Sequence, residues 1–449
     1  MTLPSDFITY TKELFGEERW QRYLAAFSED MPVSIRLNPF KWDNIQPNDQ
    51  TTRRPNDQTT KRLNDQTTKR LNDNPPVPWC RNAYYLPERP NFTLDPLLHA
   101  GAYYVQEAGS MFLDEVLRQH MPEDGPLTAL DLCAAPGGKS TLLRAALPEG
   151  SLLYSNEPDR RRANILMENM QKQGHPDVIV TNNFPRDYRK AGLQFDVILT
   201  DVPCSGEGMF RKDEGAIGEW SLANVMKCQQ LQRSIIEDIW DCLKPGGLLI
   251  YSTCTFNLRE DEENVRWICE EMGADILPVE IKEEWNITGS LLKGWDEPVY
   301  RFIPGTTKGE GLFMAAMRKQ GDFLPSRKES MPDTKAKRNK KKSPSKGDLE
   351  VPLRILCGGH YSGTVKGKAV IPDHAEALLY NLPADKYPRV ELSKDDALHY
   401  LHHEAITLPA DAPRGFVIVC YEGLALGFVK NIGNRANNLY PQEWKIRNL

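Results

Sequence analysis

The stretch Thr200-Asp201-Val202-Pro203-Cys204-Ser205-Gly206-Glu207-Gly208 decides how this chain is organised. It follows the apolar run 195–199, which is short enough for a buried strand and is closed by turn-forming residues. In open α/β sheets, ligands bind at the carboxyl ends of the strands. A second apolar run, 248–252, leads into Thr253-Cys254-Thr255. We therefore expect two strand ends to deliver two thiols to one active site.

Strand-like runs alternate with helical patterns through the middle of the chain. The expected strands are 127–133, 152–156, 178–181, 195–200 and 248–252. Such alternation predicts the α/β class, with a mainly parallel sheet covered by helices on both faces. Lys244-Pro245-Gly246-Gly247 is expected to end the preceding helix before the last of these strands begins.

Length and composition limit the possibilities further. A chain of 449 residues is too long for one hydrophobic core, so two or three domains are expected. No apolar run reaches the roughly 18 residues of a membrane-spanning helix, and the N-terminus does not resemble a secretory signal. The nine cysteines are scattered without a C-x-x-C pair, which argues against a zinc site or a disulfide framework. We expect a cytoplasmic protein with reduced thiols, no membrane partner and no metal.

An octad repeat occupies part of the N-terminal region. Its copies are 48–55, 56–63 and 64–71, and each holds at most one apolar residue. A repeat of this length cannot build a supersecondary unit, and this composition cannot bury a core. The repeat predicts a disordered surface insertion at 46–75. The basic pairs within it leave an RNA-contacting arm as the alternative.

A second change of composition predicts a linker near residue 330. Residues 335–346 are rich in Lys and Ser, so we assign a Lys-rich linker to 321–349. A solvated spacer is the simpler role for it, and phosphate contact is the alternative. The short strand-like runs of 350–449 predict a separate small domain.

The stretch Leu130-Asp131-Leu132-Cys133-Ala134-Ala135-Pro136-Gly137-Gly138-Lys139-Ser140 predicts a strand, a tight turn and a helix start. Small residues allow a ligand to approach the backbone, and the first helical amides are free to donate to it. A P-loop needs glycine where this chain has Cys133, and G-x-G-x-x-G is also absent. A nucleoside cofactor remains, with Glu157 placed to accept hydrogen bonds from ribose hydroxyls. The alternative for Glu157 is a helix-capping or surface acid.

Three motifs together match a known family. They are Ala134-Ala135-Pro136-Gly137-Gly138-Lys139-Ser140, Asp201-Val202-Pro203-Cys204-Ser205-Gly206-Glu207-Gly208 and Tyr251-Ser252-Thr253-Cys254-Thr255. Over most of its length the chain resembles the Sun and nucleolar-protein family of RNA (cytosine-5) methyltransferases, which use S-adenosylmethionine. The octad repeat has no counterpart in the family pattern.

The resemblance implies an architecture and a set of cofactor contacts. Residues 1–100 would form an N-terminal RNA-binding region, 101–320 a Rossmann-like S-adenosylmethionine-dependent methyltransferase domain, and 350–449 a PUA-like RNA-binding domain. The family usually has an aspartate after the third strand, where this chain offers Asn183. The implied cofactor contacts are Cys133, Ala134, Ala135, Pro136, Gly137, Gly138, Lys139, Glu157, Asn183 and Asp201.

The resemblance also assigns the chemistry. Cys254 would attack carbon 6 of a cytosine, and Cys204 would assist its release. The expected partner is RNA, with 16S ribosomal RNA or the small ribosomal subunit as substrate, and the protein is expected to be a monomer. Arg160-Arg161-Arg162 could hold the RNA backbone or form a solvated helix face. The alternatives are a tRNA (cytosine-5) methyltransferase and a noncatalytic RNA-binding ribosome assembly factor.

Overall fold

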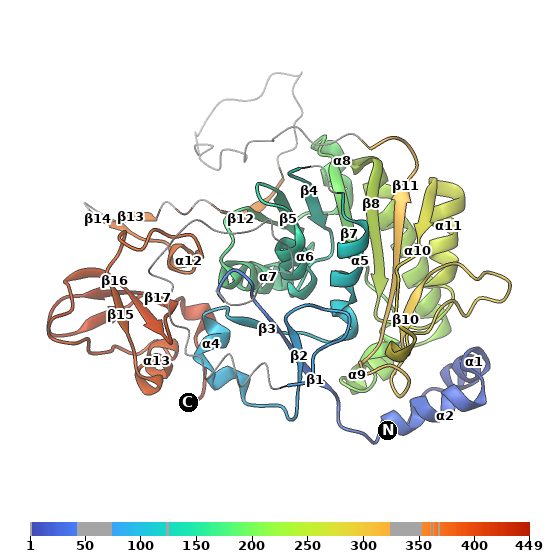
Figure 1. Cartoon of the computed structure of the whole chain (residues 1–449), viewed down its shortest axis with the longest axis horizontal. Coiled ribbons are helices and arrows are strands. Elements are labelled where there is room, and N and C mark those ends of the chain that lie inside the picture. The colour runs from blue at the N-terminus through green and yellow to red at the C-terminus, as the bar shows by residue number, and fades with distance from the viewer. Residues whose placement is uncertain are drawn as a thin grey trace.

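The structure, a computed structural model, describes residues 2–42, 74–122, 125–323, 353–359, 361, 363–366 and 369–449. Most of the predicted insertion at 46–75 and of the predicted linker at 321–349 lies outside these residues. Figure 1 shows a central sheet with helices on both faces, the N-terminal helices at one end and the C-terminal domain at the other. None of the helices in the described ranges combines the length and the apolar composition needed to cross a bilayer.

The N-terminal region packs its helices against the loops that carry the two cysteines. Its elements are α1 (Ser5–Phe15), α2 (Glu17–Ala26), β1 (Val33–Leu37), β2 (Ala83–Leu86), η1 (Phe92–Leu94), α4 (Pro96–His99) and β3 (Tyr103–Val105). The ring of Phe7 lies 5.0 Å from that of Phe210, and Phe15 lies 6.0 Å from Phe256, between ring centroids. The hydroxyl of Tyr10 accepts a hydrogen bond from the backbone N–H of Leu258. Burial of these aromatic rings fixes the N-terminus to the loop that follows Cys254.

The central sheet is mainly parallel, and its strands order as β10-β11-β8-β7-β4-β5-β6-β12. Its strands are β4 (Thr128–Asp131), β5 (Leu152–Asn156), β6 (Val178–Thr181), β7 (Phe195–Asp201), β8 (Leu243–Thr253), β9 (Ala274–Leu277), β10 (Tyr300–Phe302), β11 (Leu312–Lys319) and β12 (Ile355–Gly358). From β4 the chain first builds outward through β5 and β6, and then returns to β4 to add β7 and β8. The order therefore reverses between β4 and β7, and ligands bind at such reversals in this fold class.

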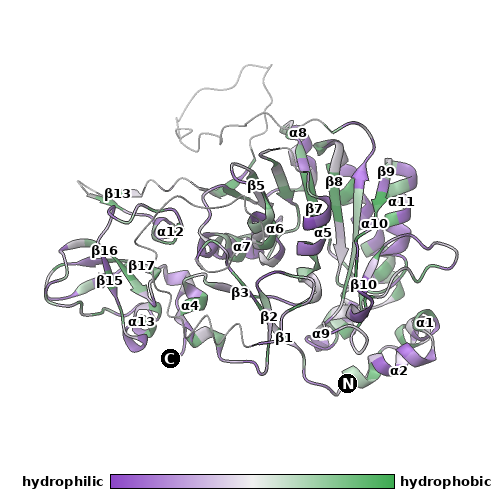
Figure 2. Cartoon of the chain, in the orientation of Figure 1, coloured by the Kyte–Doolittle hydropathy of each residue, from purple (hydrophilic) through white to green (hydrophobic). Residues whose placement is uncertain are grey.

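Helices cover both faces of the sheet. They are η2 (Gly109–Phe112), α5 (Leu113–His120), α6 (Gly138–Ala146), α7 (Arg160–Gln173), α8 (Pro185–Lys190), η3 (Glu207–Met209), α9 (Glu214–Glu219), α10 (Leu222–Ile239), η4 (Trp240–Cys242), α11 (Glu262–Met272) and η5 (Glu283–Trp285). The strands are buried on both faces, so two apolar cores lie one on each side of the sheet. Figure 2 shows the helices carrying both hydrophobic and hydrophilic segments, as amphipathic covering helices do. The α/β prediction is confirmed.

The start of β8 differs from the sequence-based expectation. Lys244-Pro245-Gly246-Gly247 lies inside the strand, because the preceding helix already ends at Ile239 and β8 begins at Leu243. Gly246 adopts a positive φ of 70°, and a Cβ there would meet the backbone of Phe323 at 2.6 Å. The glycines that were expected to end a helix therefore serve another purpose. Gly246 allows two backbone segments to approach each other more closely than any residue with a Cβ would permit.

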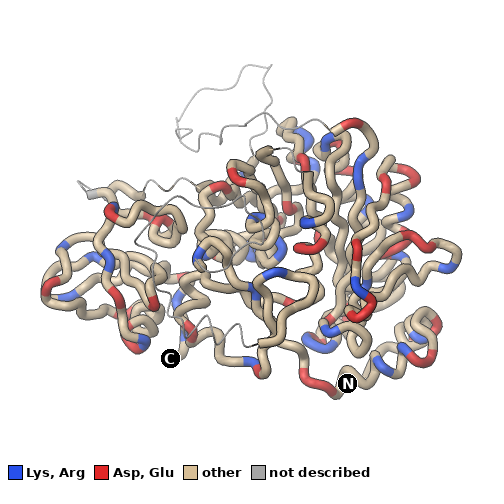
Figure 3. Tube along the Cα trace, in the orientation of Figure 1, with Lys and Arg blue, Asp and Glu red and all other residues tan. Residues whose placement is uncertain are grey.

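The C-terminal part contributes one strand to the central sheet and then forms its own domain. Beyond β12 it contains β13 (Thr364–Lys366), β14 (Ala369–Ile371), α12 (His374–Ala377), β15 (Arg389–Glu391), α13 (Lys394–Leu401), β16 (Gly415–Tyr421), β17 (Leu424–Asn431), β18 (Ala436–Asn438) and η6 (Gln442–Trp444). The sheet β15-β16-β17-β18 packs on α13 around a separate apolar core. Figure 3 shows basic and acidic residues interspersed over both domains.

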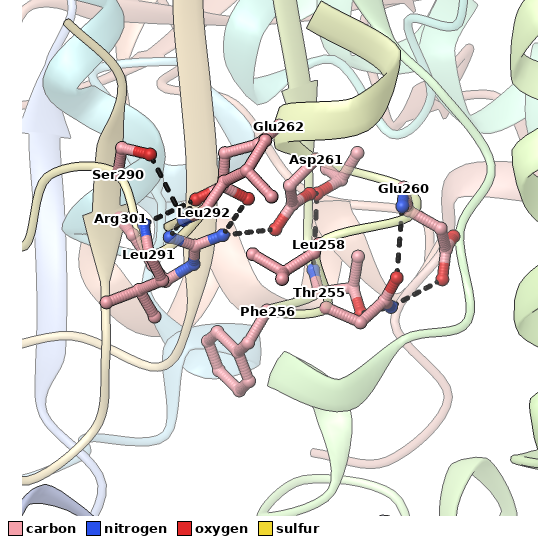
Figure 4. Close-up of polar contacts among 12 residues, drawn as sticks. Thr255, Phe256, Leu258, Glu260, Asp261, Glu262, Ser290, Leu291, Leu292 and Arg301 are labelled. Atoms are coloured by element: carbon pink, nitrogen blue, oxygen red, sulfur yellow. Dashed lines mark hydrogen bonds and ion pairs between the residues drawn. The ribbon is translucent and has the colours of Figure 1, made fainter. Parts of the chain in front are cut away.

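A buried cation holds the segment after Cys254 to the edge of the sheet (Figure 4). The guanidinium of Arg301, on β10, is fully buried and donates to both carboxylate oxygens of Glu262 at 2.9 and 2.7 Å. It also donates to Asp261 at 3.1 Å, and the other oxygen of Asp261 accepts from the Thr253 hydroxyl at 2.7 Å. Arg301 thus connects an edge strand to the residue that precedes Cys254.

Replacing Arg301 with methionine should open this segment, because Asp261 and Glu262 would remain buried without their cation. Removing one partner of a buried ion pair costs about 3–5 kcal/mol. We expect Arg301→Met to raise amide hydrogen-exchange rates of residues 255–262 at least tenfold and to lower the thermal midpoint. Arg259→Met, an exposed change on the same segment, is the control and should leave both unchanged. Unaltered exchange in Arg301→Met would contradict the anchoring role.

Candidate active site

Parallel pairing of β7 with β8 brings the two cysteines together. Asp201, the last residue of β7, is in register with Ser252. Both chains then turn into loops, and Sγ of Cys204 lies 3.1 Å from Sγ of Cys254. The backbone N–H of Cys254 points at Sγ of Cys204 at 3.3 Å. Both cysteines are partly exposed, so a ligand outside the carboxyl ends of the strands can reach them.

Cys204 is held as a neutral thiol. Its hydrogen bond with Cys254 and, next, its burial raise the pKa of Cys204 well above the ordinary value. A neutral thiol can donate a hydrogen bond to a neighbouring sulfur. At 3.1 Å either sulfur can donate to the other, so Cys204 is placed to hydrogen-bond the sulfur of Cys254.

Lys139 and Asp201 form an ion pair beside the thiols. Nζ of Lys139 lies 2.9 Å from Oδ2 of Asp201, and Oδ1 of Asp201 accepts from the Ser252 hydroxyl at 2.7 Å. Burial lowers the pKa of Lys139, but the charge of Asp201 and, more weakly, that of Cys254 raise it above its ordinary value. Lys139 thus places a positive charge in the site, close enough to Cys254 to interact with it electrostatically. Sequence reasoning assigned Lys139 only to the cofactor.

The buried carboxylate of Glu260 links the loop that carries Cys204 to the loop that carries Cys254. Glu260 accepts hydrogen bonds from the backbone N–H of Ser205 at 3.0 Å, from Gln232 at 2.7 Å and from Asn257 at 2.8 Å. The Ser205 and Thr255 hydroxyls lie 3.0 Å apart and add a direct link between the loops. Burial raises the pKa of Glu260 to about 7, although hydrogen bonding to Ser205 opposes this.

Glu207 adds a second buried tie. Its carboxylate accepts from the backbone N–H of Phe256 at 2.7 Å and from the indole N–H of Trp220 at 2.9 Å. Neither Glu207 nor Glu260 was selected from the sequence. In the sequence, each of these acids is marked only by its position shortly after a cysteine. That position does not show whether the carboxylate is buried and hydrogen-bonded or exposed on a loop.

The glycine loop lies at the carboxyl end of β4. Gly137 caps α6 with φ 118°, a conformation that favours glycine, and no side chain of the N-cap residue satisfies the first amides of α6. Ala134 and Ala135 are buried, Cys133 is half-buried and Pro136 is exposed. Burial raises the pKa of Cys133 well above its ordinary value, so this thiol packs as a neutral group. Beneath the loop, Asp131 is fully buried with Oδ2 bonded to Ser140 at 2.7 Å.

Glu157 follows β5 and is almost completely buried. Its Oε1 accepts from the backbone N–H of Asp159 at 2.9 Å, while Oε2 accepts no hydrogen bond and lies 3.4 Å from the Arg162 guanidinium. The backbone of Ala135 also lies close enough to the carboxyl group to lower its pKa. A buried acceptor with spare capacity fits a ligand that donates hydroxyl groups. Burial also raises the pKa of Glu157 above its ordinary value. These contacts suit the ribose contact predicted for Glu157.

Asn183 follows β6, and the protein itself already engages its side chain. Oδ1 accepts from the backbone N–H of Arg354 at 2.9 Å, and Nδ2 donates to the Arg354 carbonyl at 3.2 Å. A carbonyl oxygen can accept a second hydrogen bond, so the predicted contact with the adenine amine would share Oδ1 with Arg354. The sequence carried no signal for the Arg354 contact, because 171 residues separate the partners.

Glu260 should make stability depend on pH. A carboxyl whose pKa is raised in the fold stabilises it at low pH, and this contribution is lost as pH rises through the folded pKa, here about 7. We expect thermal stability to fall between about pH 4.5 and pH 7, by up to roughly 3 kcal/mol from this group. Glu260→Gln should reduce the fall, while Glu263→Gln should keep it. An equal fall in all three proteins would refute this role.

Sequence comparison identifies related proteins along the whole chain. Residues 119–318 match the family described as 16S rRNA methyltransferase RsmB/F. Residues 46–108 match the N-terminal domain of 16S rRNA methyltransferase RsmF, and residues 387–446 match the methyltransferase RsmF PUA domain. The chain is similar to "Ribosomal RNA small subunit methyltransferase F" of Aliivibrio fischeri, with 28% identity over 487 residues, 98% of this chain and 97% of the relative. The protein of the same name from Pectobacterium atrosepticum is 34% identical over 255 residues, 56% of this chain and 52% of the relative.

Solved structures share the fold. A methyltransferase homolog protein from Pyrococcus horikoshii is 25% identical with a TM-score of 0.54, over 71% of this chain and 100% of that chain. NSun6 from the same organism, in a structure with SFG, is 20% identical with a TM-score of 0.55, over 71% and 99%. The Rossmann-like catalytic domain and the PUA-like C-terminal domain predicted from the sequence are therefore confirmed. With all three of its regions matched in order, residues 119–318 form a methyltransferase domain similar to the RsmB/F type, flanked by regions similar to those of RsmF, and the chain is an RNA methyltransferase.

Proposed function

We propose that this protein methylates carbon 5 of a cytidine in 16S ribosomal RNA, through a covalent adduct with Cys254 and with S-adenosylmethionine as the methyl donor. The observation that supports it most directly is the pair of sulfurs 3.1 Å apart at the carboxyl ends of β7 and β8. The RsmB/F match and the names of the relatives support the choice of ribosomal RNA.

The chemistry follows from the weakness of carbon 5 as a nucleophile. A Cys254 thiolate bonds to carbon 6, and the electron pair of the 5,6 double bond becomes available at carbon 5. When bound, S-adenosylmethionine would supply the electrophilic methyl group for carbon 5, and its sulfur would keep the bonding electrons as the thioether of S-adenosylhomocysteine. The proton of carbon 5 then leaves to solvent, the 5,6 double bond re-forms, and the bond between carbon 6 and sulfur breaks. The neutral Cys204 thiol is placed to donate a hydrogen bond to the departing Cys254 thiolate.

The Lys139–Asp201 pair would orient the base and favour the adduct. Its charged groups lie beside the thiols, where they can hydrogen-bond the ring nitrogen and the amine of cytosine. Donation to the ring nitrogen draws electron density from carbon 6 and promotes thiolate addition. A cytosine in a helix cannot reach these groups, so the target must be flipped out or single-stranded.

The cofactor assignment draws on two features of the described site. The glycine loop presents free helix amides, and Glu157 presents a buried carboxylate oxygen without a hydrogen bond. These features fit the amino-acid and ribose ends of S-adenosylmethionine respectively. The monomeric state and the cytoplasmic location stay predictions from the sequence.

Two alternatives differ in measurable ways. A tRNA methyltransferase would modify a tRNA cytidine, which bisulfite sequencing of total RNA with and without the gene would locate. A noncatalytic assembly factor would bind RNA and transfer no methyl group to any cellular RNA. The adjacent Cys204 and Cys254 favour catalysis, because binding alone requires neither thiol.

Cys254→Ala should abolish methyl transfer, because it removes the proposed nucleophile. Transfer of radiolabelled methyl groups from S-adenosylmethionine to 16S RNA should fall at least about 1,000-fold. Cys269→Ala, a half-buried cysteine on α11, should retain wild-type activity. Retained activity in Cys254→Ala would falsify the nucleophile assignment.

Cys204→Ala should instead stall after methyl transfer, because the departing sulfur loses its hydrogen-bond donor. We expect a protein–RNA adduct that survives denaturing gels and disappears in the Cys204→Ala, Cys254→Ala double variant. If competent RNA gives no adduct with Cys204→Ala, its role in release is wrong even if Cys254 is the nucleophile.

A further inference from the structure

The segment that enters the C-terminal domain is also a strand of the catalytic sheet. β12 pairs antiparallel with β6, with Ile355 opposite Thr181 and Gly358 opposite Ile179. Figure 1 shows β12 beside the catalytic strands, far in sequence from all of them. This edge continues directly into the carboxyl ends of β5 and β6, where the cofactor contacts Glu157 and Asn183 are predicted.

The contacts of this segment extend beyond the strand ladder. The backbone N–H of Asn182 donates to the Arg354 carbonyl at 3.0 Å, and the Asn183 carboxamide closes a reciprocal pair with the same backbone unit. Asn183 is 9% exposed. Both polar atoms of its side chain are therefore satisfied by a residue that belongs to the C-terminal segment.

Further hydrogen bonds connect Asn182 and Asn183 to the loop that carries Glu157. The Asn182 side chain donates to the carbonyls of Glu157 and Pro158, each at 2.8 Å. Asn156, which precedes Glu157, donates to the Asn183 carbonyl at 3.0 Å and accepts from its N–H at 3.0 Å. Arg354 is thus separated from the predicted ribose acid by a single residue, Asn182.

Protection of the sheet edge alone explains only part of this arrangement. Ladder bonds along 355–358 already cover the edge of β6. The carboxamide of Asn183 adds a contact that needs both a donor and an acceptor. An aspartate there could accept from the Arg354 N–H, but its other oxygen would face the Arg354 carbonyl as a second acceptor. Asparagine is the side chain of this size that satisfies both.

We propose that the Arg354 backbone is a positioning element of the cofactor site: by fixing Asn182 and Asn183 it sets the position of Glu157, so that cofactor binding depends on the docked C-terminal segment. The inference rests on the proposed use of S-adenosylmethionine. Because coupling between two sites is reciprocal, bound S-adenosylmethionine should also hold β12 on the sheet.

The test uses the full chain without RNA and measures S-adenosylmethionine binding by calorimetry. Arg354→Pro removes the N–H that Asn183 accepts while leaving every residue of the catalytic domain unchanged. We expect its dissociation constant to rise about tenfold. Arg354→Ala keeps the N–H and is the matched control, with an expected change of less than about twofold.

Two further measurements separate positioning from general damage. In the Asn183→Ala background, Arg354→Pro should cause little additional loss, because both changes remove the same contact. In the wild type, S-adenosylmethionine should slow hydrogen exchange of the amides of 355–358. Circular dichroism and the thermal midpoint show whether Arg354→Pro is folded.

The outcomes are distinct. Wild-type affinity in Arg354→Pro would overturn the inference, most directly if β12 exchanges freely while the cofactor still binds normally. Equal losses in Arg354→Pro and Arg354→Ala would also overturn it, because the side chain would then be responsible. If the wild type does not bind S-adenosylmethionine, the cofactor proposal fails together with this inference. Binding by the wild type that is insensitive to Arg354→Pro rejects the inference alone.

Discussion

The pairing of β7 with β8 is the constraint on which the site depends. Two neighbouring parallel strands have their carboxyl ends on the same side of the sheet, and here Asp201 and Ser252 are directly paired. The two loops that follow therefore start side by side, and the sulfurs of Cys204 and Cys254 lie 3.1 Å apart. A shift of the register by one residue would turn the side chains of either strand to the opposite face and remove this meeting.

Buried carboxylates then hold the two cysteine loops in one arrangement. Glu207 and Glu260 accept hydrogen bonds from backbone groups of both cysteine loops, and Asp261 connects Thr253 to the buried Arg301. Burying charge without partners is costly, so each of these groups is strongly restricted to one arrangement. The two cysteine loops are consequently held by buried groups, while the side chains of Lys139 and Asp201 remain partly exposed.

The regions outside the catalytic domain are not simple appendages. The N-terminal aromatic rings pack on the loop after Cys254, and β12 extends the sheet next to the predicted cofactor contacts. Both contacts join residues far apart in the chain to the loops at the carboxyl ends of the strands. This arrangement gives the flanking regions a physical connection to the candidate site, since displacement of either one would disturb a loop of the site.

The sequence by itself determined the fold class, the strands β5 to β7, the meeting of two cysteines at adjacent strand ends and the glycine loop, because period, turn residues and motif chemistry are local properties. It misplaced the start of β8, where glycines that look like a helix end serve a close backbone approach. Only the tertiary structure decided the partners of Lys139, Glu260, Arg301 and Asn183. Each of these depends on a contact between residues remote in sequence, and the choice between a buried partner and a solvated charge is made by packing, which no single stretch of the chain encodes.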